Sequence, residues 1–367
     1  MSGITGGFGG WVQRLPALPK PTQGIIAETL LNQSLELYIN PTEHCNFRCK
    51  YCYEDFAKGR MPRTIVESVK RFVTRQAAGR KRFYLNWFGG EPLIASDIVL
   101  QISQHAKDVC ESHAIRLSGS VTTNGWNLGP GMMAQLVSAG LTFYQITLDG
   151  HRESHDAVRV RADGKGTFDT IWNNLLALHK TDLQFSILLR VHLRPGNLDS
   201  VRALFYSVRT ELEGDRRFVL GLHPLLELGG PTRGSFETLT DERCNELCRE
   251  LKQAFGDELM VYGDAEAMDE PSKAEGCGLA VCYACKSNSF LIRSDGSIGK
   301  CTVALDKPFN AVGFLEADGQ IRFNQDRFKK WTHALYTLDP KHLACPAKLG
   351  SAYFSETDLV NVTAIAR

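Results

Sequence analysis

Three cysteines near the start of the chain form the group whose chemistry is most readily interpreted. Cys45, Cys49 and Cys52 follow the spacing C-x3-C-x2-C. A structural zinc site takes four ligands and a redox pair takes two thiols, so three neighbouring thiols match neither. Three thiolates around a four-iron cluster leave one iron without a protein ligand, and that iron can bind a small molecule. Zinc with a distant fourth ligand, such as His44, stays the alternative.

A second group of cysteines lies near the C-terminus. It comprises Cys277, Cys282, Cys285, Cys301 and Cys345. The N-terminal stretch lacks the charged and apolar segments of a secretion signal, so nothing directs these thiols to an oxidising compartment. We therefore expect a cytoplasmic protein whose cysteines ligate metal rather than form disulfides. Cys110, Cys244 and Cys248 fall outside both groups, and we expect the last two to be buried thiols on a helix.

Charge and hydropathy argue against two classes of partner. The 367 residues carry a formal net charge of +1, so there is no electrostatic basis for binding nucleic acid or an anionic membrane. The sequence has no run of 18 apolar residues, and we expect no transmembrane helix. The length suits one large domain with a smaller one beside it.

Strand and helix patterns alternate from residue 34 to residue 255. Apolar, β-rich runs that predict strands occur at 35–40, 83–88, 116–123, 142–148, 184–193 and 217–226. Helical spacing of apolar residues follows them at 63–79, 95–113, 129–139, 167–180, 197–213 and 240–255. Strands that are each followed by a helix imply an α/β fold with a parallel sheet and right-handed crossovers. The pattern alone leaves open whether the sheet is open or curved into a partial barrel.

The two ends of the chain have different patterns from the middle. Residues 1–33 begin with a Gly- and Pro-rich stretch, and we expect an irregular arm there. Residues 256–367 lose the helical spacing and show strand-turn-strand signals around Asp295 and Gly296. We expect them to form a smaller, cysteine-bearing module that follows the main domain at 34–255.

The motifs at successive strand ends resemble those of a known family. The cysteine loop follows the first expected strand, and in parallel α/β folds the loops at the carboxyl ends of strands bind ligands. C-x3-C-x2-C with Tyr51 before the last cysteine resembles the signature of radical S-adenosylmethionine enzymes. "FGGEP" (88–92), "TTNG" (122–125) and "ITLDGHRESHDAVR" (146–159) follow the next three strands, as similar motifs do in that family. The resemblance implies a partial (β/α)6 barrel rather than an open sheet.

The same resemblance implies a cofactor set and roles for the motif residues. Cys45, Cys49 and Cys52 would hold a [4Fe–4S] cluster whose open iron chelates S-adenosylmethionine. One electron from the cluster would cleave that cofactor, and the resulting 5′-deoxyadenosyl radical would abstract a hydrogen from the substrate. The implied cofactor-binding residues are Gly89 and Gly90 along the methionine portion, Glu91 at its ammonium, Tyr51 beside the adenine, and Asn124, Thr147 and Arg159 at the ribose or carboxylate. Hydrogen bonding within the protein would explain the last three equally well, and His155 receives no role.

The C-terminal cysteines resemble part of a SPASM/twitch domain, which carries one or two auxiliary iron–sulfur clusters. Cys285, Gly296 and Cys301 have its opening spacing, C-x10-G-x4-C. The later cysteine run of a full SPASM domain is missing, because Lys348 stands at the cysteine place after Cys345. The resemblance therefore implies one auxiliary [4Fe–4S] cluster on Cys285, Cys301 and Cys345, with Cys277 or Cys282 as the fourth ligand. Zinc bound by four thiolates is the alternative.

Together, the two resemblances imply a peptide-modifying radical enzyme. The expected reaction is oxidative cross-linking or cyclisation of a ribosomally made precursor peptide, with electrons from an external one-electron donor such as a flavodoxin or ferredoxin. Formylglycine formation, as in sulfatase maturases, is the first alternative, although Thr302 stands where those enzymes carry an Asp. Modification of a small molecule is the second. A non-catalytic iron–sulfur or zinc scaffold is a third, and the Gly89–Gly90 pair argues against it.

Overall fold

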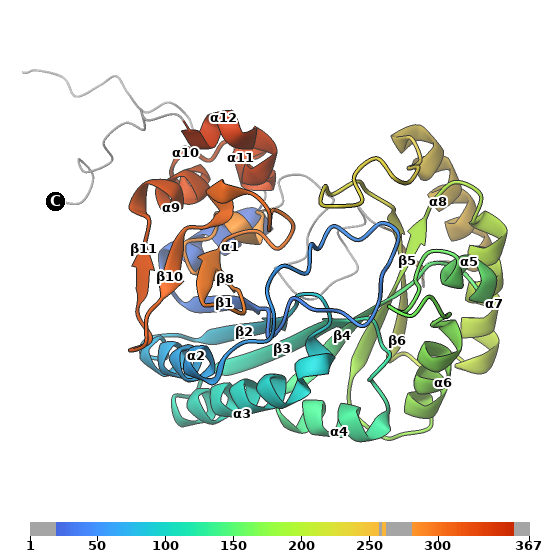
Figure 1. The fold of residues 1–367 in the computed structure, drawn as a ribbon, viewed down its shortest axis with the longest axis horizontal. Helices are drawn as coiled ribbons and strands as arrows, with labels where there is room; N and C mark the ends of the chain where they lie inside the picture. The colour runs from blue at the N-terminus through green and yellow to red at the C-terminus, as the bar shows by residue number, and fades with distance from the viewer. Residues whose placement is uncertain (1–19, 257–258, 262–280, 356–367) are drawn as a thin grey trace, which may run out of the picture.

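The computed structural model describes residues 20–256, 259–261 and 281–355 (Figure 1). Its strands form one 11-stranded sheet in the order β11-β10-β9-β8-β1-β2-β3-β4-β5-β6-β7. The strands from β1 to β7 pair in parallel with their neighbours in chain order. Their bounds are β1 Ser34–Ile39, β2 Arg82–Trp87, β3 Arg116–Thr123, β4 Leu141–Leu148, β5 Ser186–Leu193, β6 Phe218–Pro224 and β7 Leu259–Val261.

Helices connect these strands and cover one face of the curved sheet, as Figure 1 shows. They are α2 Arg63–Arg75, α3 Ser96–Ser112, α4 Pro130–Ser138, α5 Arg152–Asp156, α6 Phe168–His179, α7 Leu198–Glu211 and α8 Asp241–Phe255. The predicted α/β fold with a parallel sheet is confirmed, including each expected strand and the helix after it. Among the described strands, β11 and β7 end the sheet without pairing with each other, so the barrel is partial.

Local sequence explains where individual helices begin and which face they bury. In α2, apolar residues at helical spacing such as Val66, Val69 and Phe72 are buried against the sheet. Helix α8 begins where the Thr240 hydroxyl accepts a hydrogen bond from the Arg243 amide, and it ends at Gly256 with a φ of +83°. Such caps satisfy backbone groups that the helix itself leaves unpaired.

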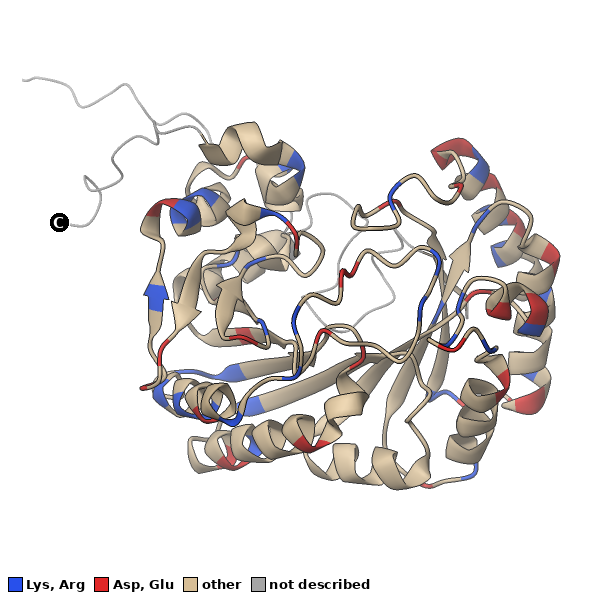
Figure 2. Cartoon of the chain, in the orientation of Figure 1, with Lys and Arg blue, Asp and Glu red and all other residues tan. Residues whose placement is uncertain are grey.

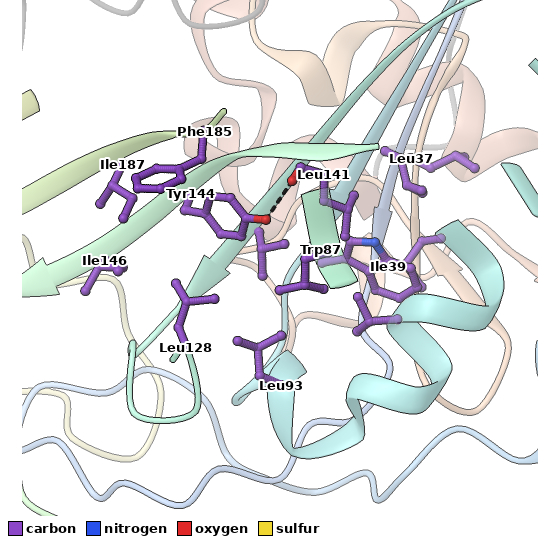
Figure 3. Packing of buried hydrophobic residues seen from close by; sticks show 14 of the residues in the cluster. Leu37, Ile39, Trp87, Leu93, Leu128, Leu141, Tyr144, Ile146, Phe185 and Ile187 are labelled. Atoms are coloured by element: carbon purple, nitrogen blue, oxygen red, sulfur yellow. Dashed lines mark hydrogen bonds between the residues drawn. The ribbon is translucent and has the colours of Figure 1, made fainter. Parts of the chain in front are cut away.

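The main core lies between the sheet and the outer helices (Figure 3). Trp87 at the end of β2 is 1% exposed and its indole N–H donates to the Ser103 hydroxyl of α3 at 2.9 Å. Tyr144 in β4 is fully buried and its hydroxyl donates to the Leu141 carbonyl at 2.6 Å. From Tyr144 to Leu148 in β4, buried residues alternate with half-buried ones, so Thr147 lies on the opposite, concave face.

The C-terminal residues continue the same sheet. Strand β8, Ser289–Ile292, pairs in parallel with β1, and β9 Ser297–Gly299, β10 Gly313–Leu315 and β11 Ile321–Phe323 extend the sheet in antiparallel fashion. The predicted turn joins β8 to β9, with Gly296 at a φ of +87°. Short helices complete this part: α9 Gln325–Thr332, α10 Ala334–Thr337, α11 Pro340–Ala344 and α12 Gly350–Ser355, with 3-10 turns η3 Tyr283–Cys285, η4 Pro308–Asn310 and η5 Pro346–Leu349. The 3-10 turn η1, Pro92–Ala95, lies in the barrel between β2 and α3.

The expectation of an irregular arm over residues 1–33 is wrong for residues 20–30. These residues form helix α1, Lys20–Leu30. Its Ile26 is buried in a small cluster with Val281, Leu335 and Leu343. A tertiary contact with residues far along the chain therefore holds this helix, whereas its own sequence contains Pro and Gly. Residues 1–19 lie outside the described part of the chain.

Two observations concern the outside of the molecule. Both basic and acidic residues occur on the outer helices, as Figure 2 shows, in keeping with the net charge of +1. Within the described ranges, no helix combines the length and the apolar character that crossing a membrane requires.

Candidate active site

The cysteine loop lies between β1 and α2, at the carboxyl ends of the parallel strands. Cys45, Cys49 and Cys52 are half-buried, and the Cys52 amide donates to the Cys49 carbonyl at 3.1 Å. The Phe47 amide points at the Cys45 sulfur, 3.3 Å away. Burial, the Glu91 carboxylate and the two other cysteines raise the pKa of Cys45 to about 12. The loop therefore gathers three thiols into one shielded place.

The donor set fits an iron–sulfur cluster better than a single ion. Among the described residues, no three His, Cys, Asp or Glu side chains converge as ligands of one metal ion. In a four-iron cluster each thiolate binds a different iron, so the ligands lie farther apart than those of a single ion. The ring of His44 is exposed and lies beside Gly59, which gives no support to a zinc site completed by this histidine.

The glycines of "FGGEP" let a second loop contact the cysteine loop directly. A Cβ on Gly89 would lie 2.4 Å from the Thr42 carbonyl oxygen, and one on Gly90 would lie 2.4 Å from that of His44. The Glu91 amide also donates to the His44 carbonyl at 3.0 Å. Contact between the two loops thus requires glycine at both positions, apart from any contact that they make with a cofactor.

Replacing Gly90 by Ala should lower the iron content of the reconstituted protein. The added methyl would meet two backbone carbonyl oxygens, those of Glu43 and His44, at 2.5 and 2.4 Å, so the loop that carries Cys45 must move. Iron per chain after anaerobic reconstitution measures the effect. The matched control is Gly131→Ala in α4, where an added Cβ meets nothing within 4 Å and the helix gains about 0.5–1 kcal/mol. Equal iron content in both variants would contradict this account of the loop contact.

Glu91 ties three motifs together beneath the cysteine loop. Its carboxylate is 1% exposed and accepts hydrogen bonds from the Leu93 amide at 2.9 Å, the Thr123 hydroxyl at 2.7 Å and the Asn124 amide at 2.6 Å. Burial raises the pKa of Glu91 although these donors oppose the rise. Because a carboxylate offers about four acceptor positions, Glu91 keeps capacity for one more donor.

Asn124 extends this connection to the cysteine loop. Its side-chain amide donates to the Asn46 side-chain oxygen at 2.8 Å and lies 3.9 Å from the Cys45 sulfur. Its own oxygen accepts from the Trp126 amide at 2.9 Å. The "TTNG" segment is thus bonded both to Glu91 and to the residue that follows the first cysteine.

A second buried network lies on the other side of the loop. The Tyr51 hydroxyl donates to Asp149 and accepts from Arg159, whose Nη1 lies 2.8 Å away. The other Asp149 oxygen lies 2.9 Å from Nδ1 of His192 in β5. Burial alone would raise the pKa of Asp149. The neighbouring His192 and Arg159 side chains have the larger, opposite effect and hold the pKa of this carboxyl below its usual range. The aromatic residue between the second and third cysteines is therefore anchored by charged groups.

The sequence analysis assigned no role to two histidines of this region. His192 pairs in register with His223 and stands in a mostly apolar strand, which was the only sequence signal for it. His155 is fully buried in α5, where Nε2 lies 2.9 Å from the Thr167 hydroxyl.

Thr147 lies on the concave face beside its register partner Arg190.

Glu54 is a further residue that sequence motifs did not indicate. It is 5% exposed, and neither carboxylate oxygen has a hydrogen-bond partner among the described residues. Burial and the neighbouring Glu43 raise its pKa to about 8. An unused buried acceptor therefore lies two residues after Cys52.

The C-terminal cysteines come together in part. Cys282 lies near both Cys301 and Cys345, since its charge contributes to the raised pKa of each, after burial. Cys285 is fully buried and its thiol donates to the His342 and Leu343 carbonyls, both at 3.2 Å. Several thiols within one short module match the donor set of an auxiliary cluster. Cys277 lies outside the described residues.

The remaining thiols are buried in the main domain. Cys244 and Cys248 lie one turn apart on α8, with 4.0 Å between their sulfur atoms, and Cys110 lies in α3. These surroundings agree with thiols that pack as small apolar groups.

Two buried ion pairs join the C-terminal module to the barrel. Arg293 donates to both oxygens of the fully buried Glu43, at 2.7 and 2.6 Å. The Lys286 ammonium lies 2.9 Å from the carboxylate of Glu36 in β1. Together with the β1–β8 pairing, these pairs fix the C-terminal cysteines relative to the cysteine loop.

Comparison with known proteins places this geometry in a family. Residues 39–204 match the model of the radical SAM superfamily. The cysteine-type anaerobic sulfatase-maturating enzyme of Clostridium novyi (strain NT) is 23% identical over 303 residues, which cover 77% of this chain and 77% of the relative. For the serine-type enzyme of Klebsiella pneumoniae, also 23% identical, the chain spans about half of the relative, 55%. The mycofactocin maturase MftC of Mycolicibacterium smegmatis is 31% identical over 152 residues, or 40% of this chain and 36% of MftC.

Solved structures share the fold at low sequence identity. Native anSMEcpe with bound AdoMet and Cp18Cys peptide superposes with a TM-score of 0.62 at 20% identity, covering 82% of each chain. SuiB of Streptococcus suis gives a TM-score of 0.52 at 14% identity, covering 85% of this chain and 71% of SuiB. The segment from the end of β1 into α7, with the cysteine loop and the three motifs that surround it, is therefore a domain of the radical SAM superfamily.

Proposed function

We propose that this protein is a radical S-adenosylmethionine enzyme that oxidises a peptide substrate. The observation that carries the proposal is the joining of the cysteine loop to three strand-end motifs by buried groups. Glu91 and Asn124 bind it on one side, and the Tyr51–Asp149 contact binds it on the other. Such a network holds the three thiols in one place, as a cluster with an open iron needs.

The residues on the loop fit the cofactors of this chemistry. Cys45, Cys49 and Cys52 would hold a [4Fe–4S] cluster, and Glu91 would accept from the ammonium of S-adenosylmethionine. When bound and reduced by an external flavodoxin- or ferredoxin-like donor, the cluster supplies the electron that converts this cofactor into a hydrogen-abstracting 5′-deoxyadenosyl radical. Thr147, which lies on the concave face, would contact the same cofactor.

The segment that follows β6 covers part of the cysteine loop. In the segment after β6, the Thr232 hydroxyl donates to the Cys52 carbonyl at 2.8 Å, and a Cβ on Gly230 would lie 2.2 Å from the Tyr53 carbonyl oxygen. The Phe236 ring contacts the Tyr51 ring at 6.2 Å between centroids. This cover would exclude water from a reactive radical.

A peptide is the substrate class that the relatives favour. Two of the curated relatives are named as sulfatase-maturating enzymes, and the superposed anSMEcpe structure holds a bound peptide. Cross-linking or cyclisation of a ribosomally made precursor is preferred over formylglycine formation because Thr302, not an acid, follows Cys301. The Thr302 hydroxyl is also engaged, 2.8 Å from the Tyr283 hydroxyl. In a cross-link, one hydrogen would leave to the 5′-deoxyadenosyl group, and the second would leave as a proton and an electron.

Anaerobic reconstitution tests the proposal. We expect about eight irons per chain, four for each of two clusters, and release of 5′-deoxyadenosine when dithionite and S-adenosylmethionine are added. Zinc without iron, or reduction without cofactor cleavage, would refute it.

The two reactions differ in their products. With a precursor peptide encoded beside the gene, mass spectrometry should show loss of two hydrogens and no aldehyde. A sulfatase-derived peptide that gains a hydrazide-reactive aldehyde would instead establish formylglycine formation, the alternative supported by the likeness to sulfatase maturases.

A further inference from the structure

Lys300 is a fully buried lysine that the proposed reaction does not use. It follows β9 and is 0% exposed. Its Nζ donates to the backbone carbonyls of Lys286 and Ser289. The same nitrogen lies 5.1 and 5.3 Å from the ring centroids of Phe290 and Phe328. The side chain is thus held between carbonyl dipoles and aromatic faces.

No carboxylate of the described residues is within salt-bridge distance of this ammonium. Glu36, whose charge also favours the Lys300 ammonium, already pairs with Lys286 at 2.9 Å and accepts from the Tyr38 hydroxyl at 2.9 Å. Burying a cation without a counter-charge costs free energy, because carbonyl dipoles replace only part of its hydration. An anion bound nearby would offset this cost.

The position of Lys300 identifies where such an anion would lie. Its backbone directly precedes Cys301, and its Nζ bonds to the carbonyl of Lys286, the residue after Cys285. Burial lowers the pKa of Lys300 to about 7, and negative charge on the nearby Cys285 and Cys282 sulfur atoms opposes this and favours the ammonium. The lysine side chain therefore spans from one C-terminal cysteine toward two others.

We propose that Lys300 is the counter-charge of the auxiliary cluster and raises its reduction potential. A cluster held by thiolates is anionic and gains a further negative charge on reduction, so a buried cation beside it stabilises the reduced form more than the oxidised one. This inference rests on the auxiliary cluster of the proposed function. With a higher reduction potential, the auxiliary cluster would be a better acceptor for the electron that leaves the peptide during its oxidation.

Redox titration of one isolated cluster tests the role. The full-length Cys45→Ala, Cys49→Ala, Cys52→Ala protein serves as the parent, because only the auxiliary cluster should remain in it. In this background, Lys300→Met should lower the ratio of reduced to oxidised cluster roughly tenfold at a fixed potential, about 59 mV for a one-electron couple. EPR-monitored titration measures this ratio. Lys300→Arg, which keeps the charge, should stay near the parent.

Lys330→Met is the matched control. This lysine is also buried in the C-terminal module, and its Nζ donates to the Phe354 carbonyl at 3.0 Å. An equal shift in Lys300→Met and Lys330→Met, or no shift in Lys300→Met with iron retained, would overturn the inference alone. A parent without iron would overturn the auxiliary cluster and the inference together. If Lys300→Met fails to fold, Lys300→Gln replaces it. This variant keeps donors for both carbonyls but removes the charge, and it should show the same shift in the ratio of reduced to oxidised cluster.

Discussion

Full-length protein with Cys45, Cys49 and Cys52 all changed to Ala will contain about four irons fewer than the wild type and will release no 5′-deoxyadenosine. The three thiols lie on one loop, held by Glu91 and Asn124 on one side and by the Tyr51–Asp149 contact on the other. Without them, no group on this loop replaces three thiolates, so the iron that would bind the cofactor is lost. Iron analysis and chromatography of the reaction products measure both effects.

A second triple variant controls for the loss of thiols in general. Cys110, Cys244 and Cys248 are buried in the outer helices, away from both cysteine groups. Changing all three to Ala should leave the iron content and cofactor cleavage intact, although core packing loses some stability. Cofactor cleavage that persists in the first variant, or equal iron loss in the two, would disprove our assignment of the cluster ligands.

Changing Arg293 to Met should lower the free energy of unfolding by about 3–5 kcal/mol. Arg293 makes two charge-assisted hydrogen bonds to Glu43, whose side chain is fully buried. Removing the guanidinium leaves Glu43 unpaired and close to Glu54, another carboxylate with no partner in the described chain. Urea denaturation of the iron-free protein, followed by circular dichroism, measures the change.

Two further variants test whether the loss of stability arises from leaving a buried charge unpaired. Arg243 pairs with Glu246 on α8 at 2.8 Å, with both side chains more than half exposed, so Arg243→Met should cost less than about 1 kcal/mol. The double variant Arg293→Met, Glu43→Met should recover much of the lost stability, because no buried charge is left alone. A single variant as stable as Arg243→Met would show that the pair does not hold the module.

The elements of the barrel were predictable because hydrophobic periodicity is a local property. The run at 63–79 gave helix α2, and the run at 142–148 gave strand β4, each within a few residues. Helix α1 was not predictable in the same way, since Ile26 is buried by Val281 and Leu343, which lie in another part of the sequence. Continuation of the sheet from β1 to β8 was missed for the same reason.

For the candidate site too, local motifs were predictable and contacts between distant segments were not. Spacing and motif resemblance indicated the three cysteines and Glu91, because both signals lie within short segments. They did not indicate that the Glu91 carboxylate accepts from the Leu93 and Asn124 amides, nor that His192 lies beside Asp149. Such contacts depend on strand register, which a single sequence does not specify.

The pairing of β1 with β8 has a consequence for how the chain reaches its native state. The ion pairs Glu36–Lys286 and Glu43–Arg293 each join residues 250 positions apart, and β8 supplies the hydrogen-bonding edge beside them. During synthesis, the edge of β1 stays uncovered until β8, which ends at Ile292, has been made. Contacts of such sequence separation form slowly. An uncovered strand edge is a template for aggregation. Expression of shortened chains that end before Ser289 will therefore yield insoluble protein even though the barrel motifs are complete.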